Sequence, residues 1–78
     1  NHSDNLIAAL HMLAIHLVMD VPDARTVFVT LHRYGMASVI TDGRGIRPGF
    51  RRYRITASGM RVNESYGVVD ISEAKTVF

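Results

Sequence analysis

The chain has 78 residues, of which 47% are hydrophobic and 21% charged, and a formal charge of +2, so it is long enough for one small domain and too short for two. The absence of cysteine excludes a disulfide framework, a thiolate zinc site and a cysteine nucleophile. A domain of this size buries only about 60% of its unfolded surface, so we expect a partner chain to add buried area. Because the chain starts at Asn1 rather than methionine, we interpret residues 1–3 as a vector remnant and give them no weight.

The first predicted element is a helix over residues 6–19, with Asp4 ahead of it as the N-cap. The helix is apolar nearly all round and needs cover on more than one side, which predicts a homodimer interface, with a helix buried at the centre of its own domain as the alternative. Its fourteen residues are too few to cross a membrane, which needs about 20. His11 and His16 are five residues apart and do not form a metal-binding pair, so we expect no metal and no cofactor. The interface residues are leucines spaced by four, three and four: Leu6, Leu10, Leu13 and Leu17.

Residues 20–23, which include Pro22, are expected to end the first helix and to open a second one that runs from Asp23 to Tyr34. Apolar residues spaced by three and four favour this helix, and Gly35 is a suitable stop. The β-branched residues of the 26–30 segment leave a strand as the alternative.

Beyond Gly35 the pattern indicates a β-hairpin, with strands over residues 37–41 and 50–57 and a turn rich in glycine between them. The two-residue period of the second strand places Tyr53 and Ile55 on one face and Arg52 and Arg54 on the other. After residue 57 the pattern is less legible, apart from a third strand over 68–71 and a short helical turn over 72–74. These elements predict an α+β fold of N-terminal helices followed by a basic hairpin.

The charge is unevenly distributed along the chain. Residues 44–61 contain six arginines and no acidic residue, whereas the segments before and after them each sum to −2. The planar fork of arginine suits phosphate groups and base edges, so the cluster favours an anionic partner, although a GC-rich genome would also raise arginine over lysine.

Motifs for catalysis are lacking. No serine lies in a G-x-S-x-G turn, and Asp20 and Asp23 are typical of carboxylates at a helix start. The glycines of the 43–49 segment lack the G-x-G-x-x-G spacing, and a strand rather than a helix follows them. We therefore expect no enzymatic activity and no catalytic residue.

The order of helix, turn, helix and basic hairpin resembles the winged helix-turn-helix domain of small bacterial regulators of the MarR and PadR type. Residues 20–27 are similar to the turn and opening of a recognition helix, and residues 31–40 to the helix end and first wing strand. Residues 52–59 look like the returning wing strand with its Thr-x-x-Gly step. The resemblance covers residues 14–60 at most, and the family has three helices before the wing where two are predicted here.

The resemblance implies a cytoplasmic, homodimeric DNA-binding protein that regulates transcription in a bacterium or mobile element. Its recognition helix would place Arg25, Thr26 and Thr30 near base edges and Arg33 near phosphate. The wing would follow the DNA backbone or enter the minor groove with Arg44, Arg47, Arg51, Arg52 and Arg54.

The alternative is an α+β protein-interaction module, or a phage-type inhibitor, in which residues 26–32 form a strand. The arginine hairpin would then bind an acidic protein surface. RNA binding lies between the two hypotheses.

Overall fold

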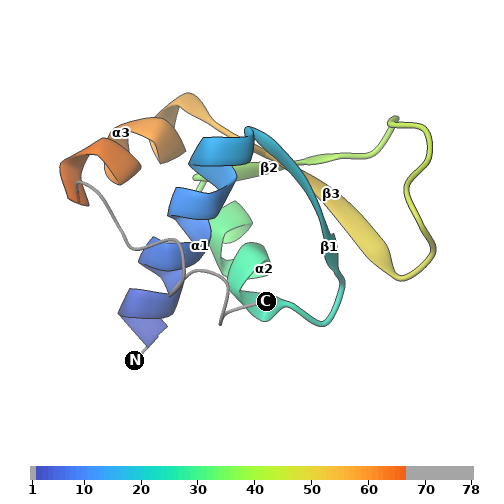
Figure 1. The fold of residues 1–78 in the computed structure, drawn as a ribbon, viewed down its shortest axis with the longest axis horizontal. Coiled ribbons are helices and arrows are strands. Elements are labelled where there is room, and N and C mark those ends of the chain that lie inside the picture. The colour runs from blue at the N-terminus through green and yellow to red at the C-terminus, as the bar shows by residue number, and fades with distance from the viewer. Residues whose placement is uncertain (1, 67–78) are drawn as a thin grey trace.

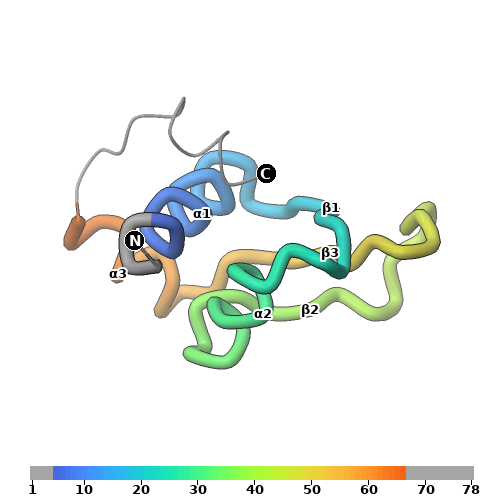
Figure 2. Tube along the Cα trace, turned by 90° about the horizontal axis from the view of Figure 1, so that it is seen from below, coloured from blue at the N-terminus to red at the C-terminus, as the bar shows by residue number. Residues whose placement is uncertain are grey.

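The computed structural model describes residues 2–66, which fold into three helices and a three-stranded antiparallel sheet (Figure 1). The strand order is β1-β3-β2, so the third strand lies in the middle of the sheet (Figure 2). The predicted α+β class is confirmed. In chain order the elements are α1 (His2–His16), β1 (Val18–Pro22), α2 (Thr26–Arg33), β2 (Ala37–Ile40), β3 (Phe50–Ile55) and α3 (Ala57–Tyr66).

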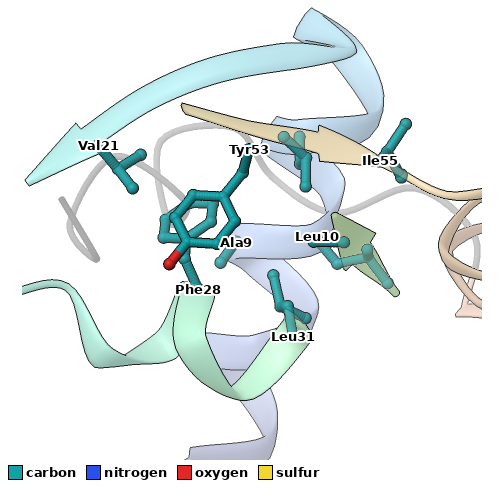
Figure 3. Close-up of a cluster of buried hydrophobic side chains, with 9 residues drawn as sticks. Ala9, Leu10, Val21, Phe28, Leu31, Tyr53 and Ile55 are labelled. Carbon is teal, nitrogen blue, oxygen red and sulfur yellow. The ribbon is translucent and has the colours of Figure 1, made fainter. Parts of the chain in front are cut away.

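The core lies between one face of the sheet and the two helices α1 and α2. Tyr53 and Ile55 of β3 are buried on this face, as the two-residue period of the strand predicts, and Phe28 of α2 is fully buried beneath them. The rings of Phe28 and Tyr53 have centroids 5.6 Å apart and are tilted by 34°, an arrangement favoured by aromatic pairs (Figure 3). The opposite face of the sheet is not part of this core.

The leucine stripe of α1 divides between the core and the surface. Leu10 and Leu13 are buried in the chain's own core, and Leu6 packs against it half-buried. Leu17 is 53% exposed. The centre of the stripe therefore packs into the domain's own core, which agrees with the alternative prediction of a central buried helix. In this fold Leu10 and Leu13 do not face outward toward a second chain.

Helix α1 ends earlier than the apolar pattern predicts, at His16 instead of residue 19. Leu17 has a φ of 69°, in the left-handed region that terminates a helix. Its amide still donates to the carbonyl oxygen of Leu13 at 2.7 Å, and its own carbonyl accepts from the amide of Ile55 at 3.1 Å. Leu17 is therefore the residue at which the backbone passes from the helix into the sheet. The helix also begins at His2, so Asp4 lies in its first turn and is not the N-cap.

The predicted turn over residues 20–23 is wrong for its first three residues, because Val18–Pro22 forms strand β1 and pairs with β3. Pro22 is tolerated as the last residue of an edge strand, where its missing N–H leaves no gap in the sheet. The second helix then begins at Thr26, three residues later than predicted. The segment is a helix and not the alternative strand over residues 26–32, and Gly35 with a φ of 78° follows its end.

Helix α3 was not predicted, and it starts at Ala57, directly after β3. Thr56 caps it: its hydroxyl oxygen accepts from the amide of Gly59 at 3.0 Å and donates to the carbonyl of Gly35 at 2.6 Å. Thr56 thereby ties α3 to the turn after α2. The predicted strand over 68–71 and helical turn over 72–74 lie outside the described residues. None of the helices within residues 2–66 is long and apolar enough to span a membrane.

Candidate nucleic-acid interface

The loop of residues 41–49, which we call the wing loop, projects from one end of the molecule, and α3 lies at the opposite end (Figures 1 and 2). It joins β2 to β3, as the sequence predicts for a hairpin. Arg44 and Arg47 lie in this loop and are exposed. Gly45 and Gly49 both have a φ near 80°, a conformation that glycine adopts without strain.

The arginines of β3 lie on opposite faces of the sheet. Because successive side chains of a strand alternate, Arg51 shares the face of the buried Tyr53, whereas Arg52 and Arg54 lie on the face that the helices leave open. Arg51 remains exposed because it lies at the end of the strand next to the wing loop. The basic hairpin thus carries cations at its tip and on both of its faces.

Arg52 forms an ion pair with Asp20, its direct neighbour on β1. Its Nε donates to Oδ1 of the carboxylate at 2.6 Å and its Nη2 to Oδ2 at 2.9 Å, a bidentate arrangement. The hydrogen bond from Arg52 lowers the pKa of Asp20, and the bond to Asp20 raises the pKa of Arg52. The Nη1 group of Arg52 donates to the backbone carbonyl of Arg44 at 3.1 Å.

The other hairpin arginines differ from Arg52 in having no carboxylate within salt-bridge distance among the side chains of residues 5–66. Arg47 instead places its guanidinium 4.6 Å from the ring centroid of Phe50, a cation–π contact. The exposed arginines that form no ion pair are Arg44, Arg47, Arg51 and Arg54. No carboxylate in the described part of the chain therefore binds their guanidinium groups directly.

The residues predicted on the second helix form a separate group on α2. Thr26 and Thr30 line an open hollow of about 490 Å³ between α2 and the start of α1, and the hydroxyl of Thr30 donates to the carbonyl of Thr26 at 3.2 Å. Arg25 lies at the N-cap position and also lines this hollow, and Arg33 is exposed in the last turn.

The two groups approach each other only at one end of the sheet. The amide of Asp23, in the turn before α2, donates to the carbonyl of Gly49 at 2.9 Å and so joins that turn to the end of the wing loop. Helix α2 packs against the inner face of the sheet, whereas Arg52 and Arg54 lie on the outer face. A ligand with a flat surface could therefore contact the wing loop and α2 from the inner side of the sheet, or the wing loop and the outer arginines Arg52 and Arg54 from the other side.

The architecture separates α1 from α2 by strand β1, so the two helices are not joined directly by a turn. One helix, α2, stands between β1 and β2.

A second hollow, of about 210 Å³, is mainly apolar and is lined by residues of α1, α3 and the turn after α2: Leu6, Ile7, Leu10, Tyr34, Met36, Val62 and Tyr66.

Histidines and acids do not converge in the described structure. The Nδ1 atom of His11 lies 3.4 Å from Oδ1 of Asn63, and that of His32 lies 3.0 Å from the carbonyl oxygen of Ala37. Among the side chains of residues 5–66, no three histidine or acidic groups lie close enough together to hold a metal ion.

Comparison of the chain with protein-family models, with curated proteins and with solved structures gave no match.

The ion pair of Arg52 is the feature of this site that sequence reasoning missed. All five hairpin arginines were expected to contact nucleic acid, but Asp20 precedes Arg52 by 32 residues, and their pairing follows from the β1–β3 register. Opposite charges at directly opposed positions of two neighbouring strands indicate such a pair. This signal was missed because residues 18–22 were not predicted to form a strand.

Proposed function

We propose that this protein binds double-stranded DNA, chiefly through the phosphate backbone, with the wing loop and β3 as the main contact surface. The observation that carries the proposal is the basic hairpin, whose arginines Arg44, Arg47, Arg51 and Arg54 are exposed and form no ion pair with a carboxylate in the described chain. Such exposed cations attract phosphates and release the counterions condensed on DNA.

The distribution of these arginines favours a groove over a flat acidic surface. Arg51 and Arg54 lie on opposite faces of β3, and Arg44 lies near the tip of the loop. A projecting loop that carries Arg44 and Arg47 can place cations near phosphates on both walls of a DNA groove, and Arg54 adds a cation on the open face of the sheet. This argument supports duplex DNA over the acidic protein partner of the alternative hypothesis.

In this proposal, residues at the start of α2 contact the base edges. Arg25 and Thr26 lie at its N-terminal end, and the bond from Asp23 to Gly49 holds the preceding turn beside the wing loop. N-terminal residues of a helix in the major groove are those that usually reach base edges. Regulation of transcription, the role implied by the winged-helix resemblance, would depend on these contacts.

The test is fluorescence-anisotropy titration of a duplex of about 20 base pairs at several salt concentrations, since each phosphate contact contributes about 0.9 to the slope of log K against log salt. We expect Arg44→Ala and Arg54→Ala each to weaken binding and to reduce this slope by about 0.9. Arg61→Ala is the matched control, because it removes one exposed arginine from α3, at the other end of the molecule.

Equal effects of all three substitutions would show that net charge, and not the hairpin, governs binding. No binding by the wild-type protein at low salt would contradict the proposal, and an acidic protein partner would then be sought. Tighter binding to a double-stranded RNA of the same sequence would replace DNA by RNA as the ligand.

A further inference from the structure

The guanidinium of Arg52 is held at the junction of the sheet and the wing loop. Two of its nitrogens bind both carboxylate oxygens of Asp20, and the third binds the carbonyl of Arg44. One side chain thus connects β1, β3 and the loop. The side chain is only 23% exposed, and all three of its nitrogens already donate within the protein.

The loop backbone passes close to this guanidinium at Gly43. A Cβ atom built on Gly43 would lie 2.8 Å from Nη1 of Arg52, so a larger residue here would require the guanidinium to move from its present position. The neighbouring Arg44 supplies the carbonyl acceptor while its own side chain points to solvent as an exposed residue. The contact therefore fixes the backbone from which Arg44 projects.

The far end of the loop is held separately. The amide of Asp23 binds the carbonyl of Gly49, the amide of Phe50 binds the carbonyl of Arg47, and the Arg47 guanidinium lies over the Phe50 ring. These contacts do not involve Asp20 or Arg52. Loss of the Asp20–Arg52 pair should therefore release the first half of the loop and leave the second half in place.

We propose that Asp20 and Arg52 are positioning residues that fix the first half of the wing loop, so that an acidic side chain is required for binding a polyanion. The consequence for DNA rests on the proposed function. Arg52 was expected to contact phosphate directly, and the geometry assigns it this different role. A fixed Arg44 loses less conformational freedom on binding than a mobile one, which strengthens the complex.

Charge alone predicts the opposite effect of removing Asp20. Asp20→Asn makes the protein more positive by one unit, which should strengthen binding to DNA if electrostatics were the only influence. Asp23→Asn is the matched control, because it gives the same charge change on an exposed residue in the adjoining turn and leaves the backbone bond to Gly49 intact.

In the anisotropy assay we expect Asp20→Asn to bind the duplex about threefold to tenfold more weakly than Asp23→Asn does. Arg52→Lys should weaken binding similarly although it retains the charge, because an ammonium group cannot span the carboxylate and the Arg44 carbonyl in the same planar arrangement. Tighter binding by Asp20→Asn, together with near-normal binding by Arg52→Lys, would overturn the proposal and make Arg52 a phosphate contact.

A second readout does not depend on DNA. Backbone ¹⁵N relaxation should give order parameters typical of rigid backbone for Gly43 and Arg44 in the wild-type protein, and values below about 0.6 in Asp20→Asn. Gly49 should remain rigid in both. If the wild-type protein fails to bind DNA but Gly43 and Arg44 become mobile in Asp20→Asn, the proposed function fails while the positioning role stands. Unchanged order parameters in a folded Asp20→Asn protein would refute the positioning role itself.

Discussion

Substitution of Gly59 by alanine tests how α3 packs. In an exposed helix interior this change stabilises a protein by about 1 kcal/mol, because glycine is a poor helix former. Gly59, however, is buried, and a Cβ atom at this position would lie 2.2 Å from the carbonyl oxygen of Met36 and 2.9 Å from Cγ1 of Ile55. The nearer atom belongs to the backbone and cannot swing away as the end of a side chain could.

The expected cost follows from what must move. Contacts below 3.0 Å are essentially never made by real Cβ atoms, so α3 and the Met36 carbonyl have to separate. That carbonyl accepts from the amide of Thr56 at 3.2 Å, and the bond would be stretched or lost. Overpacking costs about 1–3 kcal/mol and a lost hydrogen bond about 1 kcal/mol. After subtraction of the gain in helix propensity, we expect Gly59→Ala to lower the free energy of unfolding by about 2 kcal/mol.

Urea unfolding followed by circular dichroism measures this change, and in thermal unfolding 2 kcal/mol corresponds to a melting temperature lower by roughly 8–16 °C. Glu64→Ala, at an exposed position of the same helix, is the control and should change stability by no more than about 0.5 kcal/mol. A Gly59→Ala protein as stable as the wild type would refute the packing of α3 against the turn after α2.

Three further results are expected. At Leu17, whose φ is positive, glycine should be more stable than alanine by about 1 kcal/mol in urea unfolding, the reverse of their usual order in a helix, and an advantage for alanine would argue against the left-handed conformation. Thr56→Ala removes the cap of α3 and should cost about 1–2 kcal/mol, whereas Thr56→Ser should retain most of the stability because it keeps the hydroxyl; equal losses in both would exclude capping. The Asp20 carboxyl group, followed by NMR of its carboxyl carbon, should titrate below the ordinary pKa of 3.8, because Arg52 stabilises the carboxylate. Since the pKa is lower in the folded state than in the unfolded state, the pair contributes to stability above pH 3.8. This contribution is lost as the pH falls through the folded-state pKa. An Asp20 midpoint at or above 3.8 would contradict the ion pair.

Local patterns in the sequence were sufficient for several elements. The two-residue period of β3 predicted the burial of Tyr53 and Ile55, and the glycines of residues 43–49 predicted the hairpin loop. The segment before Gly35 was correctly interpreted as a helix. The cluster of arginines is a property of residue order, so the presence of five of its six members on the hairpin also follows from the sequence, whereas Arg61 lies on α3.

What the sequence by itself determined is therefore the local periodicity and the position of the charges along the chain. Only the tertiary structure decided that residues 18–22 form a strand, because an apolar run fits a helix as well as a buried strand until β3 supplies its hydrogen bonds. The same pairing places Asp20 opposite Arg52, so Arg52 forms an ion pair while the other hairpin arginines do not. Contacts between residues 32 positions apart depend on the register of two strands, and that register is set by burial of one sheet face against α1 and α2.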